Sequence, residues 1–369
     1  MSPNPRYAIG VPNVGPFGDP SLLVNMAVAA EEHGWDGFFV WDHLLYHDPG
    51  WHVADPVVVI AAVAARTARI RIGTLVNVLA RRRAGKVARE AVTLDRLSQG
   101  RLVFGAGLGS LEVEFTAFGE PGEARERAAR LDESLDLMDA LWTGEPVTFR
   151  GEHLTATGVT MLPRPVQRPR IPVWCGGRWP VKAPFRRAAR WDGVMPTHTG
   201  YGLGETMPPE ELLAAVRYTR EHRTAPGPFD VALEGRTDGT VQDRGGRHVV
   251  PYVEAGLTWW IEALGWWRGT PEDAMTRITQ GPPRRARLRG RCGHAVLVGV
   301  PDGLGPVAGA RLGEDPVDVG LDRGVAQEQA LGDLGVAQAR CEQGQHLGLA
   351  GGEPVRRCAR TRTESGTCA

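Results

Sequence analysis

The sequence predicts a (β/α)8 barrel over residues 1–284, followed by a tail of different composition at residues 285–369. Three observations lead to this prediction: eight short apolar runs, a helical pattern after each run, and a spacing that places all of them within residues 7–280. Barrels of this type have eight parallel strands, each followed by a helix, in about 250 residues. A doubly wound sheet usually has fewer strands and a glycine-rich fingerprint after the first, whereas Val11-Pro12-Asn13 follows here.

The expected strands are short and apolar throughout, which is typical of strands buried on both faces in a parallel sheet. They cover residues 7–11, 38–41, 70–76, 102–107, 172–177, 193–195, 229–233 and 257–262. The expected helices alternate with them, and Asp19-Pro20 and Asp55-Pro56 are typical helix starts, with a capping aspartate before a proline. They cover residues 20–33, 56–65, 86–97, 123–142, 183–189, 208–221, 248–255 and 271–280. Residues 144–170 are rich in Thr, Pro and Gly, which predicts a small hairpin and a surface loop.

The tail does not continue the alternating pattern. It contains no Phe, Trp, Tyr, Ile, Met, Lys or Asn, and the sequence Gly-Val-Ala-Gln occurs twice, from Gly324 and from Gly335. A segment of this composition buries little apolar area against the entropy cost of ordering it. We interpret it as a disordered tail and hypothesise a shifted-frame read-through of G+C-rich coding sequence, with a genuine disordered extension as the alternative.

The composition argues against several classes of function. The formal net charge is zero, which gives no reason to expect nucleic acid or an anionic membrane as a partner. Residues 1–6 contain no apolar signal segment, and no apolar run approaches the roughly 18 residues of a membrane span, so a cytoplasmic protein is expected. Within the first 290 residues Cys175 is the only cysteine, which excludes a disulfide framework or a zinc ribbon there.

Polar side chains follow the second expected strand abruptly. The apolar run ends on Trp41, and Asp42 and His43 come next. Strand ends of this kind form the mouth of an α/β barrel, where such folds carry their chemistry. For an isolated Asp-His pair the alternative is structural, with Asp42 capping the next segment and His43 packing beside Trp41.

Several blocks, in order, resemble the bacterial luciferase-like flavin monooxygenases and their deazaflavin (coenzyme F420)-dependent relatives. The most characteristic are Trp41-Asp42-His43 and Gly176-Gly177-Arg178. The other blocks lie at residues 34–37, 64–67, 70–74, 81–83, 90–109, 162–167, 171–174 and 187–193. The resemblance extends over about residues 6–283, and the tail has no counterpart in the family.

The resemblance implies a TIM-type barrel that holds a flavin-type ring at the carboxyl ends of its strands. It implies F420 as the leading cofactor and FMN as the alternative. Two glycines and an arginine at Gly176-Gly177-Arg178 are expected to bind phosphate, because glycines let backbone N–H groups approach an anion closely. A plain tight turn is the structural alternative.

Two further segments are expected to contact the ring. Thr74, Leu75 and Asn77 match the place where the family carries a backbone bulge, which can include a non-proline cis peptide. Gly107, at the end of the fourth strand, is expected to leave room for the cofactor. Its surroundings do not have the spacing of a dinucleotide fingerprint.

The expected catalytic residues are His43, Asp42 and Glu112. The Asp-His block belongs to the active site in the deazaflavin enzymes, so His43 is expected to donate to a developing negative charge or to transfer a proton, and Asp42 to orient the imidazole. Glu112 and Glu114 follow the fourth strand and are both candidate acids, with a solvated loop as the alternative for each. Weaker candidates are His198, Trp260 and Glu262, and no metal site is expected.

The function expected from the resemblance is an oxidoreductase acting on a small organic substrate. It would transfer a hydride from reduced F420, or activate oxygen with reduced FMN supplied by a partner flavin reductase, and the family suggests a homodimer. A non-catalytic flavin-binding barrel is the first alternative. A metal-dependent barrel hydrolase is less favoured, because the first strand, residues 7–11, lacks a His-x-His pair.

Overall fold

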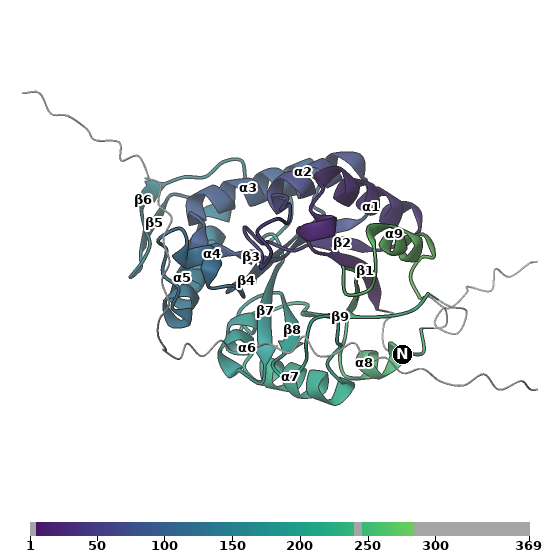
Figure 1. Cartoon of the computed structure of the whole chain (residues 1–369). Helices are drawn as coiled ribbons and strands as arrows, with labels where there is room; N and C mark the ends of the chain where they lie inside the picture. The colour runs from purple at the N-terminus through teal and green to yellow at the C-terminus, as the bar shows by residue number, and fades with distance from the viewer. Residues whose placement is uncertain (1–4, 240–245, 284–369) are drawn as a thin grey trace, which may run out of the picture. The chain divides into compact units, whose positions relative to one another are not determined.

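The computed structural model describes residues 5–239 and 246–283, so the predicted tail lies outside the described residues. Eight parallel strands close into a barrel in the order β1-β10-β9-β8-β7-β4-β3-β2, with helices outside the ring (Figure 1). The strands are β1 (Arg6–Val11), β2 (Gly37–Val40), β3 (Arg71–Val78), β4 (Leu102–Gly107), β7 (Val173–Trp179), β8 (Gly193–His198), β9 (Asp230–Gly235) and β10 (Trp259–Ala263). The predicted fold class is confirmed.

Each barrel strand is followed by a helix at the place where the sequence predicts one. The helices are α1 (Pro20–Glu32), α2 (Pro56–Arg66), α3 (Ala84–Leu97), α5 (Ala124–Trp142), α6 (Lys182–Ala188), α7 (Pro209–Glu221), α8 (Val250–Glu254) and α9 (Pro271–Thr279). Asp19 and Asp55 cap α1 and α2 by accepting backbone N–H groups of their first turns. The predicted hairpin is β5 (Val147–Arg150) with β6 (Thr155–Val159).

Three short elements and two strand ends differ from the expectation. The short elements are the 3-10 turns η1 (Gly15–Phe17) and η2 (Leu79–Arg81) and the single helical turn α4 (Val113–Thr116). Strand β7 continues to Trp179 because residues 178 and 179 pair with Thr197 and His198 of an equally extended β8. The two glycines of β7 therefore lie within a strand, where the sequence suggested its end.

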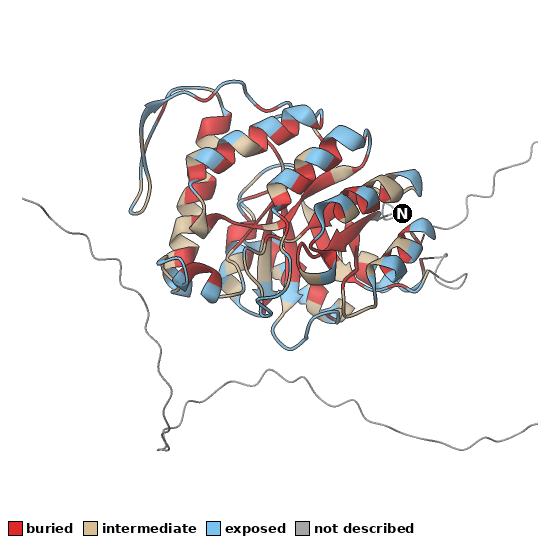
Figure 2. Ribbon diagram, turned by 45° about the horizontal axis from the view of Figure 1, so that its top comes forward, coloured by how far each residue is buried: buried red, intermediate tan, exposed pale blue. Residues whose placement is uncertain are grey.

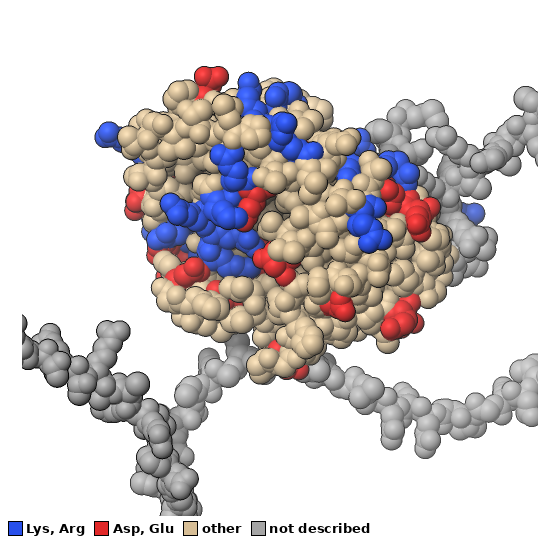
Figure 3. Space-filling view, turned by 90° about the horizontal axis from the view of Figure 1, so that it is seen from above, with Lys and Arg blue, Asp and Glu red and all other residues tan. Residues whose placement is uncertain are grey.

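The helices bury one side against the strands and expose the other, as Figure 2 shows by the red and blue faces of each ribbon. None of the described helices is long and apolar enough to cross a membrane. Seen over α1, α2 and α3, the surface carries both charge signs, with Lys and Arg gathered toward one side (Figure 3).

Large apolar side chains fill the barrel interior on the amino-terminal side of the mouth. Phe39 and Trp174 pack with ring centroids 5.6 Å apart, and Trp174 and Trp259 with centroids 5.4 Å apart. The whole interior cluster is Ala8, Phe39, Leu75, Val103, Trp174, Met195, Ala232, Trp259 and Ile261. Side chains alternate along a strand, so the next inward positions toward the carboxyl ends lie two residues further on.

Several of those next inward positions are glycines. Beyond Ala8, Val103 and Trp174 they are Gly10, Gly105 and Gly176. A Cβ atom on Gly105 would lie 2.2 Å from the carbonyl oxygen of Thr74, so glycine lets β3 and β4 approach closely there. On these three strands, no side chain therefore lies between the apolar interior cluster and the carboxyl ends.

Gly107 allows the neighbouring strand end to pack down onto β4. A Cβ atom there would lie 2.2 Å from Cγ2 of Val76, a β-branched side chain with little freedom to move. We expect Gly107→Ala to lower the free energy of unfolding by about 1–3 kcal/mol, as overpacking does. Gly85→Ala on α3, where a Cβ meets nothing within 4 Å, should instead raise it by about 0.5 kcal/mol. Urea unfolding of both full-length variants measures this, and equal effects would contradict the packing argument.

Candidate active site

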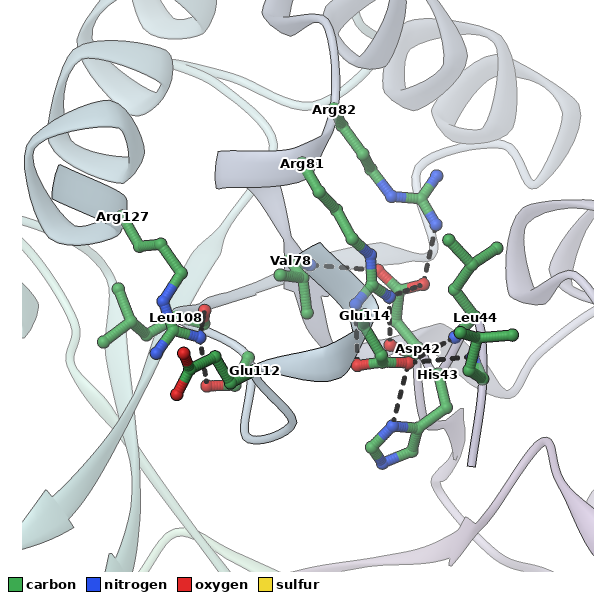
Figure 4. Close-up of polar contacts among 12 residues, drawn as sticks. Asp42, His43, Leu44, Val78, Arg81, Arg82, Leu108, Glu112, Glu114 and Arg127 are labelled. Carbon is green, nitrogen blue, oxygen red and sulfur yellow. Dashed lines mark hydrogen bonds and ion pairs between the residues drawn. The ribbon is translucent and has the colours of Figure 1, made fainter. Parts of the chain in front are cut away.

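His43 and Glu114 form a hydrogen-bonded pair at the carboxyl ends of the strands. Nδ1 of His43 lies 3.2 Å from Oε1 of Glu114, as Figure 4 shows. The imidazole is 13% exposed and the carboxylate 1%. An ionised carboxylate only accepts hydrogen bonds, so it holds the proton of a neutral imidazole on Nδ1. Nε2 of His43 has no hydrogen-bond partner within residues 5–239 and 246–283.

Glu114 is held ionised by its neighbours in spite of its burial. Burial opposes its ionisation, but the hydrogen bond from His43, the charge of Arg81 and the N–H of Leu44 outweigh this effect and lower the pKa of the carboxyl. Arg81 donates from Nη1 to Oε2 at 2.9 Å, and the N–H groups of Leu44 and Leu45 donate to Oε1 at 2.5 and 3.1 Å. The carboxylate therefore joins the β4–α5 loop to the segment after β2.

The structure brings Glu114, and not Glu112, to His43. Glu114 lies on α4 beside the buried Phe115, whereas Glu112 is exposed and lies on the side of Leu108 and Arg127 in Figure 4. Residues two apart on a helix do not share a face, so one turn of helix is enough to separate the two carboxylates. The expected catalytic role of Glu112 has no support from this geometry.

Asp42 does not orient the imidazole, contrary to the expectation from sequence. Its side chain is buried and accepts from Val78 N at 2.9 Å, Arg81 Nη2 at 3.1 Å and Arg82 Nη2 at 2.7 Å. Successive residues leave the end of β2 in opposite directions, so Asp42 points to β3 while His43 points to α4 (Figure 4). Asp42 fixes the loop after β3 and thereby holds Arg81 in place for Glu114.

Asn13 fixes the main chain of His43, a role that sequence analysis missed. Its amide accepts from His43 N at 3.1 Å and donates to the carbonyls of His43 and Ala54 at 2.9 and 2.7 Å. The side chain is fully buried. The available signal was an asparagine two residues after the first strand, close to the level of the other strand ends.

The predicted bulge at the end of β3 is confirmed. The pairing of β3 with β4 shifts between Thr74 and Asn77, and the peptide bond between Leu75 and Val76 is cis. Thr74 and Asn77 are buried, and Asn77 donates to the carbonyl of Gly105 at 2.8 Å. Val76 is the half-buried residue of the bulge and packs against the interior cluster. It therefore presents an apolar surface at the mouth.

Gly176 and Gly177 lie inside β7, and Arg178 is exposed beside them. Pairing with β8 continues through all three residues, while pairing with β4 stops at Cys175. At the two glycines, the edge of β7 that faces β4 is therefore not paired with β4. Phosphate binding at Gly176, Gly177 and Arg178 stays a prediction, on a strand edge rather than on a turn.

Several weaker candidates have structural partners. Glu262 is fully buried and pairs with Arg268 at 2.7 Å, which ties β10 to the loop that follows it. Trp260 donates to Glu262 at 3.3 Å on the outer side of the barrel. His198 lies 3.8 Å from Glu211 of α7. Within the described ranges, no group of three metal-binding side chains occurs, and Cys175 is buried.

A cavity of about 440 Å³ lies next to the His43 pair. It is lined by residues of the segments after β2, β3 and β4 and by the start of α2: Asp42, His43, Leu44, Val53, Ala54, Asp55, Pro56, Arg81, Arg82, Phe118 and Glu120. Arg81 and Arg82 are already paired with Glu114 and Asp42, so the cavity has charged walls whose charges largely balance.

Comparison with known proteins gives one family. The family model described as luciferase-like monooxygenase matches residues 8–236. An F420-dependent glucose-6-phosphate dehydrogenase of Nakamurella multipartita is 38% identical over 201 residues, covering 54% of this chain and 57% of that protein. The corresponding protein of Gordonia bronchialis is 37% identical over 203 residues, covering 54% and 58%. The chain thus matches little more than half the length of these relatives.

Solved structures show the same fold at lower identity. A monooxygenase from Streptomyces bottropensis has a TM-score of 0.58 at 24% identity, covering 74% of this chain and 96% of that one. An F420-dependent secondary alcohol dehydrogenase, solved with an F420-acetone adduct, has a TM-score of 0.62 at 18% identity, covering 77% and 100%. These structural similarities support the barrel fold alone.

The lowered pKa of Glu114 predicts a pH-dependent contribution to stability. Because its folded-state pKa lies below the usual value near 4.5, the carboxylate stabilises the fold above that pH. The contribution is lost as the pH falls through the lowered pKa. We expect Glu114→Gln to reduce the free energy of unfolding by about 3–5 kcal/mol at pH 7, because it removes one charged partner of a buried ion pair. Denaturant unfolding from pH 7 to pH 3 should show the two proteins converging, and a constant difference would contradict the assignment.

Proposed function

The chain belongs to the luciferase-like monooxygenase family, and from this premise we propose that it is an F420-dependent oxidoreductase acting at the mouth of its barrel. Two relatives at 38% and 37% identity are named F420-dependent dehydrogenases, which supports F420 over FMN as cofactor. The observation that carries the proposal is the His43–Glu114 pair, which leaves Nε2 of a half-buried imidazole without a hydrogen-bond partner among the described residues.

The residues at the mouth fit a flat ring. Val76 presents its side chain above Gly107 and Gly176, where a Cβ atom would lie 2.2 and 3.0 Å from it. The interior cluster beneath it is apolar. We assign Thr74, Asn77 and Gly107 to the support of this surface, and Gly176, Gly177 and Arg178 to the phosphate end of the cofactor. F420 bound at this place would supply the hydride-transfer chemistry.

His43 is assigned as the proton-transferring group. When an alcohol is oxidised to a carbonyl compound, Nε2 takes the hydroxyl proton, and it returns that proton in the reverse direction. The ionised Glu114 stabilises the imidazolium that results, and it keeps the proton of the resting imidazole on Nδ1. Asn13 and Asp42 act as positioning residues, since they hold the main chain of His43 and the side chain of Arg81.

Binding of the two cofactors tests the proposal directly. Titration of the full-length protein with F420 and separately with FMN, followed by cofactor fluorescence, should give an affinity for F420 at least about tenfold higher, a difference of about 1.4 kcal/mol. Preference for FMN would move the chain to oxygen-activating chemistry with a partner flavin reductase. Binding of neither cofactor would remove the flavin-type assignment.

Substitutions test the roles of the imidazole and of the two glutamates. We expect His43→Asn to lower kcat by about 100-fold or more with F420 affinity unchanged, the usual size of a lost acid–base group. Glu114→Gln should lower kcat and shift its pH profile, because it removes the charge beside the imidazole. Glu112→Gln should change neither quantity, since this side chain is exposed and away from His43. A large loss of kcat in Glu112→Gln alone would restore the interpretation made from sequence. The reaction is followed by the absorbance of oxidised F420 with secondary alcohols and glucose 6-phosphate.

A further inference from the structure

A cluster of five aromatic rings, called here the aromatic wall, lines one side of the mouth. It consists of Trp41, Tyr46, Trp51, Trp266 and Trp267, all half-buried, and comes from the segments after β2 and β10. Trp41 and Trp267 are stacked, with centroids 5.3 Å apart and planes 10° apart. Tyr46 and Trp51 are likewise stacked at 5.4 Å, and Trp266 meets both pairs edge to face. Trp41 also meets the imidazole of His43 edge to face, with centroids 5.7 Å apart.

Glu234, on strand β9, contacts this aromatic wall through Trp41. It lies two residues beyond the inward-facing Ala232 on β9, so its side chain also points into the barrel. Its Oε1 lies 3.5 Å from Nε1 of Trp41 and would be 3.5 Å from a Cβ atom on Gly10. Since β1 and β10 separate β9 from β2, the contact between Glu234 and Trp41 reaches across this part of the mouth.

Glu234 differs from Glu114 and Glu262 in having no cationic partner within the described ranges. Glu114 pairs with Arg81, and Glu262 pairs with Arg268. Burial raises the pKa of Glu234, and the hydrogen bond from Trp41 offsets only part of that effect. Its Oε2 has no hydrogen-bond partner among residues 5–239 and 246–283. The group is thus a half-buried carboxyl with hydrogen-bonding capacity left over.

We infer that Glu234 and Trp41 bind an uncharged hydroxyl group of the substrate, so that the chain prefers an alcohol or an unphosphorylated sugar to a phosphate ester. The inference rests on the proposed function, and it names the substrate class for the same mouth. A hydroxyl both donates and accepts, so it can accept from the indole N–H and share a hydrogen bond with the carboxyl.

Two other head groups fit this place less well. A phosphate beside Glu234 would meet a carboxyl group without a neutralising Lys or Arg, which disfavours it as a like-charge contact. Stacking covers one face of each ring in the pairs Trp41–Trp267 and Tyr46–Trp51, which reduces the aromatic face that an ammonium group needs. A hydroxyl requires neither a counter-charge nor a free face.

Three probes of one shape and different head group test the inference: cyclohexanol, cyclohexyl phosphate and cyclohexylamine. Their binding to the full-length protein is measured by calorimetry at pH 7, with and without F420. We expect cyclohexanol to bind at least about tenfold more tightly than either charged probe. Glu234→Gln should raise the affinity for cyclohexyl phosphate about tenfold and change that for cyclohexanol less than about threefold. Trp41→Phe should weaken cyclohexanol about fivefold, the worth of one hydrogen bond.

Glu254→Gln, which alters an exposed glutamate on α8, is the matched control and should change none of the three affinities. Tightest binding by the phosphate or the amine, failure of all three probes to bind, or equal effects of the two glutamate substitutions would each overturn the inference. Failure of the wild-type protein to bind F420 would defeat the proposed function instead. Bound F420 with no preference among the probes would defeat only the assignment of substrate class.

Discussion

The buried charge network of Glu114, Arg81 and Asp42 is the interaction on which the mouth of the barrel depends. It joins the segment after β2, the 3-10 turn after β3 and the single helical turn after β4, three loops that have no sheet pairing to one another. Side-chain exposure of 4% or less at all three residues means that separating them would leave charges buried and unpaired. The position of the His43 imidazole follows from this network, because Glu114 reaches it only when Arg81 and the N–H groups of Leu44 and Leu45 hold the carboxylate in place.

Side-chain size also shapes the mouth of the barrel. Aromatic residues fill the interior up to the level of Phe39, Trp174 and Trp259, and three of the next inward positions, on β1, β4 and β7, are glycines. Because a barrel interior is filled by layers of side chains, these glycines leave their part of the layer without side-chain atoms and change no backbone hydrogen bond. The bulge that carries Val76 uses two of these glycines, so backbone and side-chain constraints meet at one place.

The sequence was sufficient for the barrel, since each strand is an apolar run and each helix has its own capping or periodic signal. The strand-end position of His43 could also be predicted, because it depends on local order along the chain, whereas the bulge after Thr74 was expected from the family resemblance. Side-chain direction was harder. Asp42 and His43 diverge because consecutive residues alternate, and Glu112 and Glu114 diverge because a turn of helix begins there. The large apolar residue Phe115, directly after Glu114, was the sequence signal that could have placed this segment against the core. Asn13 and Arg81 act through contacts with residues 30 or more positions away, which no local pattern reveals.

Glu114 and Glu234 show how one residue type can take two roles at the mouth of one barrel. Both lose hydration on burial, which by itself favours the protonated acid. Glu114 gains a cation and several donors that more than compensate, whereas Glu234 gains one long contact with an indole N–H, so their pKa values move in opposite directions. Titratable groups whose pKa values are driven apart in this way can divide the work of a site. The ionised Glu114 suits the imidazole, which becomes a cation when it takes a proton. Glu234, which has no cation beside it within the described ranges, suits a neutral hydroxyl, and Trp41 contacts both His43 and Glu234.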